Sequence, residues 1–231
     1  MNRQKFAVIG IGQFGGAIAR SLSKSGAEVM AIDIQVDLVE MIADEVAYAV
    51  ALDATDKKAL LSQDIKDYNT VVVAIGGNFE QELLCIVTLM DLGIKRIIAR
   101  ARGAAQNRIL MQLGIKEIFS PEDEVGIIVA ERLLNPNLVS YLQLPDDYRI
   151  AELIAPKRCV GRTLDDIDLR DRYRLSLVTI KKETIVKVDD EPVVEQHIAG
   201  VPDSRTVIDE KDFLVVFGKN KDIDRFIEIN D

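Results

Sequence analysis

The chain has 231 residues and is acidic: 38 aspartate and glutamate residues against 29 lysine and arginine residues give a formal net charge of −9. This charge argues against nucleic acid or an anionic membrane surface as the main partner. Two cysteines without CxxC spacing and a single histidine, His197, disfavour a disulfide framework, a Cys/His zinc site and a Ser–His–Asp triad. The sequence has no run of about 18 apolar residues and no signal-peptide pattern, so we expect a soluble protein of the cytosol.

The first 120 residues alternate short apolar runs with amphipathic stretches. Near-continuous apolar runs are typical of strands that helices cover on both faces. The expected strands are 6–10, 29–33, 47–52, 71–76, 96–101 and 117–120. The expected helices are 14–25, 36–43, 57–62, 80–92 and 104–113. Right-handed crossovers between such elements give an α/β fold with a Rossmann-type, doubly wound parallel sheet.

The pattern changes after residue 120. Ser120, Pro121 and Glu122 predict an N-cap, a first helical residue and an early acid of a new helix with a broad apolar face. Residues 139–144 form a second amphipathic stretch, which we interpret as the partner in a helix pair. The pair is expected to be a crossover or dimerisation element, and a helix folded back on its own domain is an equal alternative.

Short strand-like runs follow a linker at 144–147. The expected strands are 150–155, 175–181, 184–188 and 213–217, with a hairpin turn at 181–183 and helices at 163–168 and 221–228. This composition predicts a small α+β C-terminal lobe. The expected organisation is a Rossmann domain with its dimerisation helix over 1–134, a crossover or linker over 135–146 and the lobe over 147–231.

A glycine motif lies between the first expected strand and the first expected helix. Gly10, Gly12 and Gly15 form GxGxxG, in which the glycines permit a tight turn, close approach of a pyrophosphate and close packing of helix on strand. The N-terminus of the helix attracts phosphate. Asp33 ends the second strand, where a carboxylate accepts hydrogen bonds from ribose hydroxyls and repels a 2′-phosphate. The motif therefore predicts an adenine nucleotide with an unmodified ribose; the alternative is a Rossmann sheet whose glycine turn binds nothing.

Further candidate residues follow other strands at the same edge of the sheet. Asp53 is placed to meet the adenine edge, and Thr55 is placed to cap the next helix. The alternative is that these residues only cap the helix and do not contact a ligand. Arg100 is placed to neutralise phosphate, with a surface ion pair as the alternative. The small residues after the fourth strand allow the backbone to approach a ligand. The remaining candidates of this group are Ala54, Ala74, Gly76 and Asn78.

The order of these motifs resembles the RCK domain family, which regulates potassium conductance. The resemblance rests on AVIGIGQFGGAIARSLSKSGAEVMAIDI, LDATD, VVVAIGGN, IARA and IKEIFSPEDEVG in the first part, and on RTLDDIDLRDRYRLSLVTIKK and DEKDFLVVFGKNKDIDRF in the second. The match is closest to the KtrA/TrkA-type cytosolic subunits of bacterial potassium transporters. It implies homodimers assembled into an octameric ring, bound to a membrane potassium-translocating subunit of the KtrB/TrkH type at the inner face of the membrane.

The resemblance also implies ligands and site residues. ATP or ADP, with NAD or NADH as further ligands, would bind with phosphates at Gly12 to Gly15, including Phe14, and with Asp53 and Ala54 near the adenine. Glu122 matches a glutamate that helps to hold a divalent cation such as Mg²⁺. Gln13 departs from the family, whose loop carries an arginine that reaches the γ-phosphate across the dimer. This departure puts the discrimination of ATP from ADP in doubt.

The C-terminal lobe of some relatives binds cyclic di-AMP. The resemblance assigns apolar walls and a phosphate partner to Ile167, Leu169, Arg170 and Pro192, although the acid Asp171 beside Arg170 is unfavourable to a phosphate.

The leading interpretation is a nucleotide-operated switch and not an enzyme. The rival is an NAD-dependent oxidoreductase, which needs a proton-transfer residue and a substrate pocket. His197 lies in a loop-like stretch, and neither Tyr148 nor Tyr173 has a lysine four residues later, as a short-chain reductase would. A third interpretation is a nucleotide-free scaffold.

Overall fold

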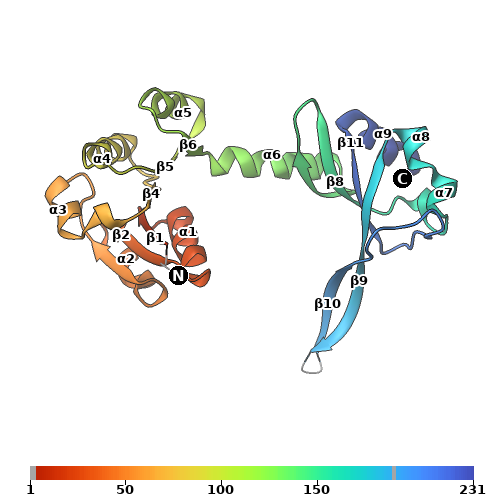
Figure 1. The fold of residues 1–231 in the computed structure, drawn as a ribbon, viewed down its shortest axis with the longest axis horizontal. Helices are drawn as coiled ribbons and strands as arrows, with labels where there is room; N and C mark the ends of the chain where they lie inside the picture. Colours follow the sequence, from red (N-terminus) through yellow and green to blue (C-terminus); the bar gives the residue numbers. More distant parts are fainter. Residues whose placement is uncertain (1–3, 189–190) are drawn as a thin grey trace. The chain divides into compact units, whose positions relative to one another are not determined.

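The computed structural model describes residues 4–188 and 191–231 (Figure 1). Contacts within the chain divide it into two compact units, Met1–Val125 and Gly126–Asp231, with the boundary inside helix α6 (Pro121–Leu134). The predicted fold class, a Rossmann-type sheet followed by a small α+β lobe, is confirmed. The predicted division at residues 134 and 146 stays a prediction.

The first unit is built on a six-stranded parallel sheet in the order β3-β2-β1-β4-β5-β6. The chain starts at the centre, runs outward to β3, returns to β4 beside β1 and then runs outward to β6. This is the doubly wound order, whose switch point lies between β1 and β4. The strands are β1 (Lys5–Ile9), β2 (Glu28–Asp33), β3 (Tyr48–Ala51), β4 (Thr70–Val73), β5 (Ile97–Arg100) and β6 (Glu117–Phe119). The helices are α1 (Gln13–Lys24), α2 (Val36–Ile42), α3 (Lys57–Ser62), α4 (Phe79–Asp91) and α5 (Gly103–Gln112), with 3₁₀ turns at Ala43–Glu45 and Ile65–Asp67.

Side chains of the central strands alternate between two apolar cores. Ile9 of β1 packs in one core with Leu89 of α4 and Leu110 of α5. Its neighbour Val8 packs in the other core with Ala19 of α1. Because successive strand residues point to opposite faces, helices cover both faces of the sheet, as the near-continuous apolar runs predict.

The second unit contains a five-stranded antiparallel sheet in the order β10-β9-β11-β8-β7 (Figure 1). Its core includes Leu153, Ile180, Leu214 and Phe226. Cys85 and Cys159 are buried free thiols, one in each unit. The strands are β7 (Leu138–Gln143), β8 (Tyr148–Ile154), β9 (Ser176–Val188), β10 (Glu191–Ile198) and β11 (Phe213–Lys219). The helices are α7 (Leu164–Ile167), α8 (Leu169–Tyr173) and α9 (Asn220–Asn230), with a 3₁₀ turn at Lys157–Cys159.

Two local predictions for this part of the chain are wrong. Residues 139–144 were expected to form a helix, but most of them lie in strand β7, which pairs with β8 and buries Leu138. A hairpin turn was expected at 181–183, but β9 runs through these residues without interruption. Pairing with neighbouring strands decides both cases, because a short amphipathic stretch does not distinguish a helix from a strand.

The strand β10 also changes the interpretation of His197. The histidine was expected in a loop, but it lies in β10 opposite Lys182 of β9. Its side chain is exposed, and its Nε2 is 3.4 Å from Glu195 Oε2. A histidine on the exposed strand of a hairpin has the position of a surface residue.

Helix α6 begins at Pro121, as the Ser120-Pro121-Glu122 pattern predicts. No residue of this helix is buried, and its apolar side chains are exposed. The exposed apolar side chains of α6 are Val125, Ile127, Ile128, Val129, Leu133 and Leu134. An uncovered apolar face of this extent is typical of a surface that meets a partner. Within residues 4–188 and 191–231, we find no helix with the length and apolar character that crossing a bilayer requires.

Candidate nucleotide-binding site

The glycine turn between β1 and α1 has the geometry that its sequence predicts. Gly10 has a φ of +90°, and a Cβ there would lie 2.8 Å from the carbonyl carbon of Ala74. A Cβ on Gly15 would overlap the carbonyl oxygen of Gly10. Gly12 differs from both, because nothing lies within 4 Å of the position that its Cβ would take. Gly10 and Gly15 therefore build the turn, whereas Gly12 faces open space.

The N-terminus of α1 leaves backbone donors free for an anion. Its first helical hydrogen bond joins the N–H of Gly16 to the carbonyl oxygen of Gly12, 2.8 Å away. The N–H groups of Gln13, Phe14 and Gly15 precede that bond and have no intrahelical acceptor. Gly12 is the N-cap and supplies no side-chain cap, and the first turn contains no acidic residue. Such a helix end is a ready site for phosphate.

Asp33 supports the glycine turn as well as facing the site. One carboxylate oxygen accepts the N–H of Ile11 at 2.7 Å, and the other accepts the N–H of Gln35 at 2.9 Å. These two bonds fix the carboxylate at the end of β2. Each oxygen keeps acceptor capacity for a ribose hydroxyl, because a carboxylate offers about four lone-pair sites.

Asp53 and Thr55 lie after β3 but do not cap α3. The N-cap is Asp56, whose side chain accepts the N–H groups of Lys58 and Ala59. Asp53 instead accepts the N–H of Thr55 at 2.9 Å and its hydroxyl at 2.7 Å. The predicted cap at Thr55 is therefore wrong, since Asp56 is the residue directly before the first helical residue, Lys57, and caps the helix.

These residues surround one cavity of about 940 Å³ at the carboxyl edge of the sheet. Its volume lies within the range of small-molecule sites. Gly15 is the one predicted nucleotide residue outside the lining, since it packs beneath Gly10. The predicted residues that line the cavity are Gly10, Gly12, Gln13, Phe14, Asp33, Asp53, Ala54, Thr55, Ala74, Gly76, Asn78, Arg100 and Glu122. Residues from six chain segments thus meet where the switch-point rule places a ligand.

Arg100 forms an ion pair, the alternative that the sequence left open, and its role toward phosphate stays a prediction. It forms an ion pair with Glu122 of α6, and its guanidinium lies 5.4 Å from the centroid of the Phe14 ring. Its side chain is only 14% exposed. Because it also lines the cavity, the paired guanidinium remains within reach of an anionic ligand.

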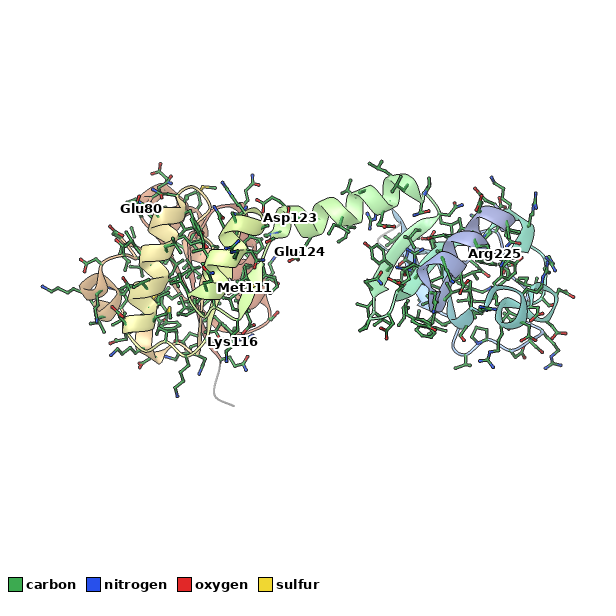
Figure 2. The ribbon with its side chains drawn as sticks, turned by 90° about the horizontal axis from the view of Figure 1, so that it is seen from above. Glu80, Met111, Lys116, Asp123, Glu124 and Arg225 are labelled. Carbon is green, nitrogen blue, oxygen red and sulfur yellow. The ribbon has the colours of Figure 1, made fainter. Side chains whose placement is uncertain are left out.

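Glu122 stands in the acidic first turn of α6, followed by Asp123 and Glu124 (Figure 2). A hydrogen bond from its own backbone N–H lowers the pKa of Glu122, and the guanidinium of Arg100 lowers it further. The carboxylate is therefore ionised near neutral pH. Among the described residues, no three His, Cys, Asp or Glu side chains converge as a metal site.

Asn78 is the N-cap of α4, and its amide oxygen is used in that cap. That oxygen accepts the N–H of Glu80 at 3.0 Å and of Gln81 at 3.3 Å. Gly76 lies two residues earlier, where a Cβ would be 2.8 Å from a guanidinium nitrogen of Arg100 and 3.0 Å from one of Arg102. The absence of a side chain at Gly76 therefore lets two arginines approach the same wall of the cavity.

Two charged residues of this region were not identified from the sequence. Arg102 lines the cavity beside Arg100. Glu82 of α4 is 2% exposed, and burial raises its pKa to about 8 despite the nearby arginines. A signal for Glu82 existed in the sequence, because it precedes Ile86 and Leu89 at helical spacing on the inward face of α4.

The candidate cyclic di-AMP residues do not form a surface in one copy of the lobe. Ile167 and Leu169 are buried in the core of the second unit, so their side chains are not the expected walls. Arg170 is exposed. Pro192 lies in β10 opposite Lys187, and its side chain is outside the part of the structure that is described. A cyclic di-AMP site stays a prediction that would need rearrangement or a second copy.

The chain is similar in sequence to known proteins over nearly its whole length. Residues 6–121 match the family model of the TrkA-N domain. Ktr system potassium uptake protein C of Bacillus subtilis (strain 168) is 34% identical over 226 residues, which cover 97% of this chain and 96% of that protein. Ktr system potassium uptake protein A of the same organism is 32% identical over 226 residues, covering 98% and 96%.

The fold is shared with a solved channel structure. The GsuK channel bound to NAD superposes with a TM-score of 0.60 at 16% identity, covering 99% of this chain and 39% of that one. This likeness agrees with the two-part architecture. On the match of its first unit and its identity to the two Bacillus proteins, the chain belongs to the TrkA-N domain family and is a homologue of the Ktr potassium uptake proteins.

Proposed function

We propose that this chain is a regulatory subunit of a potassium uptake system, and that an adenine nucleotide at the carboxyl edge of its first sheet is the signal. The observation that carries the proposal is the cavity of about 940 Å³, into which the N-terminus of α1 and the open side of Gly12 both face. The homology to Ktr potassium uptake proteins supports the transport role. The nucleotide acts by binding one state of the subunit better than another.

The proposed placement of the nucleotide follows from the chemistry of the lining. Phosphates lie at the backbone N–H groups of Gln13 to Gly15, with Arg100 as the side-chain cation. The ribose lies at Asp33, and the adenine side lies near Asp53 and Ala54. ADP, ATP and NAD(H) all present such a phosphate and ribose, and the GsuK channel, which has this fold, was solved with NAD.

A divalent cation such as Mg²⁺ fits this arrangement as a companion of the phosphates. Glu122 offers an ionised carboxylate on the wall of the same cavity. Mg²⁺ is commonly held by one or two carboxylates together with phosphate oxygens and water. Glu122 would then exchange part of its contact with Arg100 for the cation.

The proposed assembly is a dimer that builds an octameric ring on a membrane potassium-translocating subunit of the KtrB/TrkH type, at the cytoplasmic face of the membrane. The exposed apolar side chains of α6 supply a surface for pairing with a second copy. In this proposal residues 1–134 form the nucleotide-binding domain with its pairing helix, and residues 147–231 form the lobe.

The oxidoreductase alternative has little support from the site. It needs a proton-transfer group next to the nicotinamide. The lining contains no histidine, tyrosine, lysine or cysteine, and His197 belongs to the other unit. The scaffold alternative requires the open cavity at the glycine turn to bind nothing.

The first test is thermal unfolding of the full chain with ATP, ADP, NAD, NADH and NADPH, each with and without Mg²⁺. A ligand at 100 times its dissociation constant should stabilise its unit by about 2.7 kcal/mol. We expect stabilisation by nucleotides with a free 2′-hydroxyl and none by NADPH, because Asp33 repels the 2′-phosphate. Stabilisation by none of them would support the scaffold. The strongest ligand is then added to liposomes carrying the translocating subunit and this chain, where a change in potassium flux is expected.

A further inference from the structure

Glu82 is a buried carboxyl group that the placement of the nucleotide does not use. It is the fourth residue of α4, and its side chain is almost fully buried. Within residues 4–188 and 191–231, no hydrogen-bond partner is found for its Oε1 atom. A buried carboxylate without full compensation is costly, so the group favours its protonated form.

The charged neighbours of Glu82 come from elements packed around α4. Arg100 at the end of β5 and Arg102 in the following loop favour its ionised form, whereas burial opposes it more strongly. On α4 itself, burial raises the pKa of Cys85 to about 12, so that thiol stays neutral. Glu122 of α6 acts on the group through its ion pair with Arg100. Burial is thus the main influence on the pKa of Glu82, and the charges of the two arginines, with a backbone hydrogen bond at Arg100, act against it.

Glu82 and the nucleotide cavity share these two arginines. A small cavity of about 60 Å³ is lined by Glu82 together with Gln106 of α5. Arg100, Arg102 and Gly76 line both this small cavity and the large one. In addition, the Nε atom of Arg100 is buried and has no partner among the described residues. A phosphate on one side and the Glu82 carboxylate on the other would thus compete for the same positive charge.

We propose that Glu82 couples nucleotide binding to proton uptake, so that the chain binds phosphate with Glu82 protonated and releases it more readily when Glu82 is ionised. The proposal rests on the proposed nucleotide site. A phosphate close to Arg100 adds negative charge near Glu82. It also attracts the guanidinium groups of the arginines away from Glu82, and both effects disfavour the ionised carboxylate. By linkage, an ionised Glu82 weakens the binding of phosphate by the same free energy.

The direction of the pH response follows from this linkage. Binding raises the affinity of Glu82 for its proton, so nucleotide affinity is highest when the group is already protonated and falls as pH rises through its pKa. Burial raises that pKa to about 8 in the free protein, and bound nucleotide raises it further, so affinity falls mainly above about pH 8, between the two pKa values. Because one proton is involved, nucleotide affinity cannot fall by more than about tenfold per pH unit. We expect a total loss of nucleotide affinity of roughly three- to tenfold.

The experiment is isothermal titration of the full chain with NAD and with ADP between about pH 7.5 and pH 9. Both probes keep a nearly constant charge in this range. The pyrophosphate of NAD has no group that titrates there, and the last ionisation of the ADP phosphate, with a pKa near 6, is nearly complete by about pH 7.5. Titration at pH 8 in two buffers of different ionisation enthalpy measures the protons taken up. We expect the wild-type chain to take up a fraction of one proton per nucleotide bound.

Two variants isolate the group responsible. Glu82→Gln keeps the size of the side chain and cannot ionise, so its affinity should be independent of pH and its proton uptake should vanish. Glu80→Gln is the matched control, because Glu80 is exposed at the beginning of the same helix and is not part of either cavity lining (Figure 2). This control should keep the wild-type proton uptake.

The outcomes separate this inference from the proposed site. Binding of either probe with pH-independent affinity and no proton uptake in the wild-type chain overturns the role of Glu82 and leaves the site intact. Unchanged uptake in Glu82→Gln also overturns it. Failure of both probes to bind at every pH overturns the site and the inference together. If Glu82→Gln does not fold, the buffer comparison on the wild-type chain still decides whether protons are taken up.

Discussion

The two units of this chain use charged side chains in different ways. In the first unit, Asp33, Asp53 and Arg100 line an open cavity at one edge of the sheet. In the second unit, Arg149 is buried and pairs with Asp224 and Glu131. Charges that line a cavity retain their capacity for a ligand, whereas Arg149 uses its terminal guanidinium nitrogens in ion pairs within its own unit.

The same contrast appears along β9, which carries two lysines at its centre. Lys181 forms an ion pair with Glu152 of β8. The Nζ atom of Lys182 lies 2.8 Å from Oδ2 of Asp209 and 3.5 Å from Oδ1 of Asp212. The hydrogen bond to Asp209 raises the pKa of Lys182. Such pairs fix how strands and loops meet, although partly exposed pairs contribute little stability.

The N-termini of the helices also differ in whether a side chain caps them. In the second unit, Thr163 and Asp166 form a capping box at α7, and Asp168 caps α8. Helix α1 of the first unit begins at Gly12 without a side-chain cap. A cap would occupy the N–H groups that phosphate needs. The comparison teaches that the start of α1 leaves its N–H groups free where phosphate is expected, whereas α7 and α8 of the second unit use side-chain caps at their starts.

The variant with the largest expected effect removes a core side chain from the second unit. Phe226 is fully buried and packs edge-on against Tyr173, with ring centroids 4.9 Å apart. Phe226→Ala should lower the free energy of unfolding of the second unit by about 3–5 kcal/mol, as loss of a buried phenyl ring does. Nucleotide affinity in the first unit should not change at temperatures where the variant is folded. Thermal unfolding and titration with ADP measure the two quantities.

The neighbouring Arg225 provides the control for this variant. It is exposed on the same helix, α9 (Figure 2), and Arg225→Ala should alter stability by no more than about 0.5 kcal/mol. A loss of ADP affinity in Phe226→Ala but not in Arg225→Ala would mean that the lobe supports the site, and the separation of roles between the units would fail.

The next test places a charge where the first unit leaves space. Gly12 has a φ of −67° and open space around its Cβ position, so a side chain is accepted without backbone strain. Gly12→Asp should leave the fold intact and reduce nucleotide affinity about 100-fold, equivalent to about 2.7 kcal/mol, because the carboxylate would occupy the phosphate position. Gly12→Asn adds a side chain of similar size without the negative charge, so this variant should lose less nucleotide affinity than Gly12→Asp. Equal affinity in Gly12→Asp and the wild-type chain would place the ligand elsewhere.

Sequence patterns were sufficient for the sheet and the glycine turn of the first unit, because the signals for both lie in short stretches of the sequence. The apolar runs of β1, β2 and β4 are buried on both faces, and this environment leaves a continuous hydrophobic run in the sequence. Gly15 is required by its contact with Gly10 within one strand–turn–helix segment, and the GxGxxG spacing marks Gly10 as well, although its close contact is with Ala74 after β4. The position of the cavity then follows from the order of the strands.

Apart from the cap at Thr55, which its neighbours Asp53 and Asp56 decide, two failures depend on contacts between distant residues. The centre of β9 resembles a turn because it carries Lys181 and Lys182, whose partners Glu152 and Asp209 lie far away in the sequence. Glu82 ends the polar run EQE at the start of α4, which outweighs the weaker signal of its helical spacing to Ile86 and Leu89, and residues of β5 and α5 line the small cavity around it. Polar residues are assigned correctly from sequence when their partners are close along the chain, and wrongly when the partners come from another strand or helix.

The smallest test adjusts a contact of the site that the sequence itself calls into question. Gln13 begins α1 and lines the cavity with an uncharged side chain, where the RCK family carries an arginine directed at the γ-phosphate across the dimer. Gln13→Arg should raise the affinity for ATP relative to ADP by roughly fivefold, or about 1 kcal/mol, since an added guanidinium favours the additional phosphate. Gln13→Lys tests whether charge alone is sufficient, because lysine cannot make the bidentate contact. Competition titrations of ATP against ADP measure the ratio. An unchanged ratio in Gln13→Arg would mean that the terminal phosphate lies outside the reach of this position, and the first unit would then respond to the nucleoside and the inner phosphates alone.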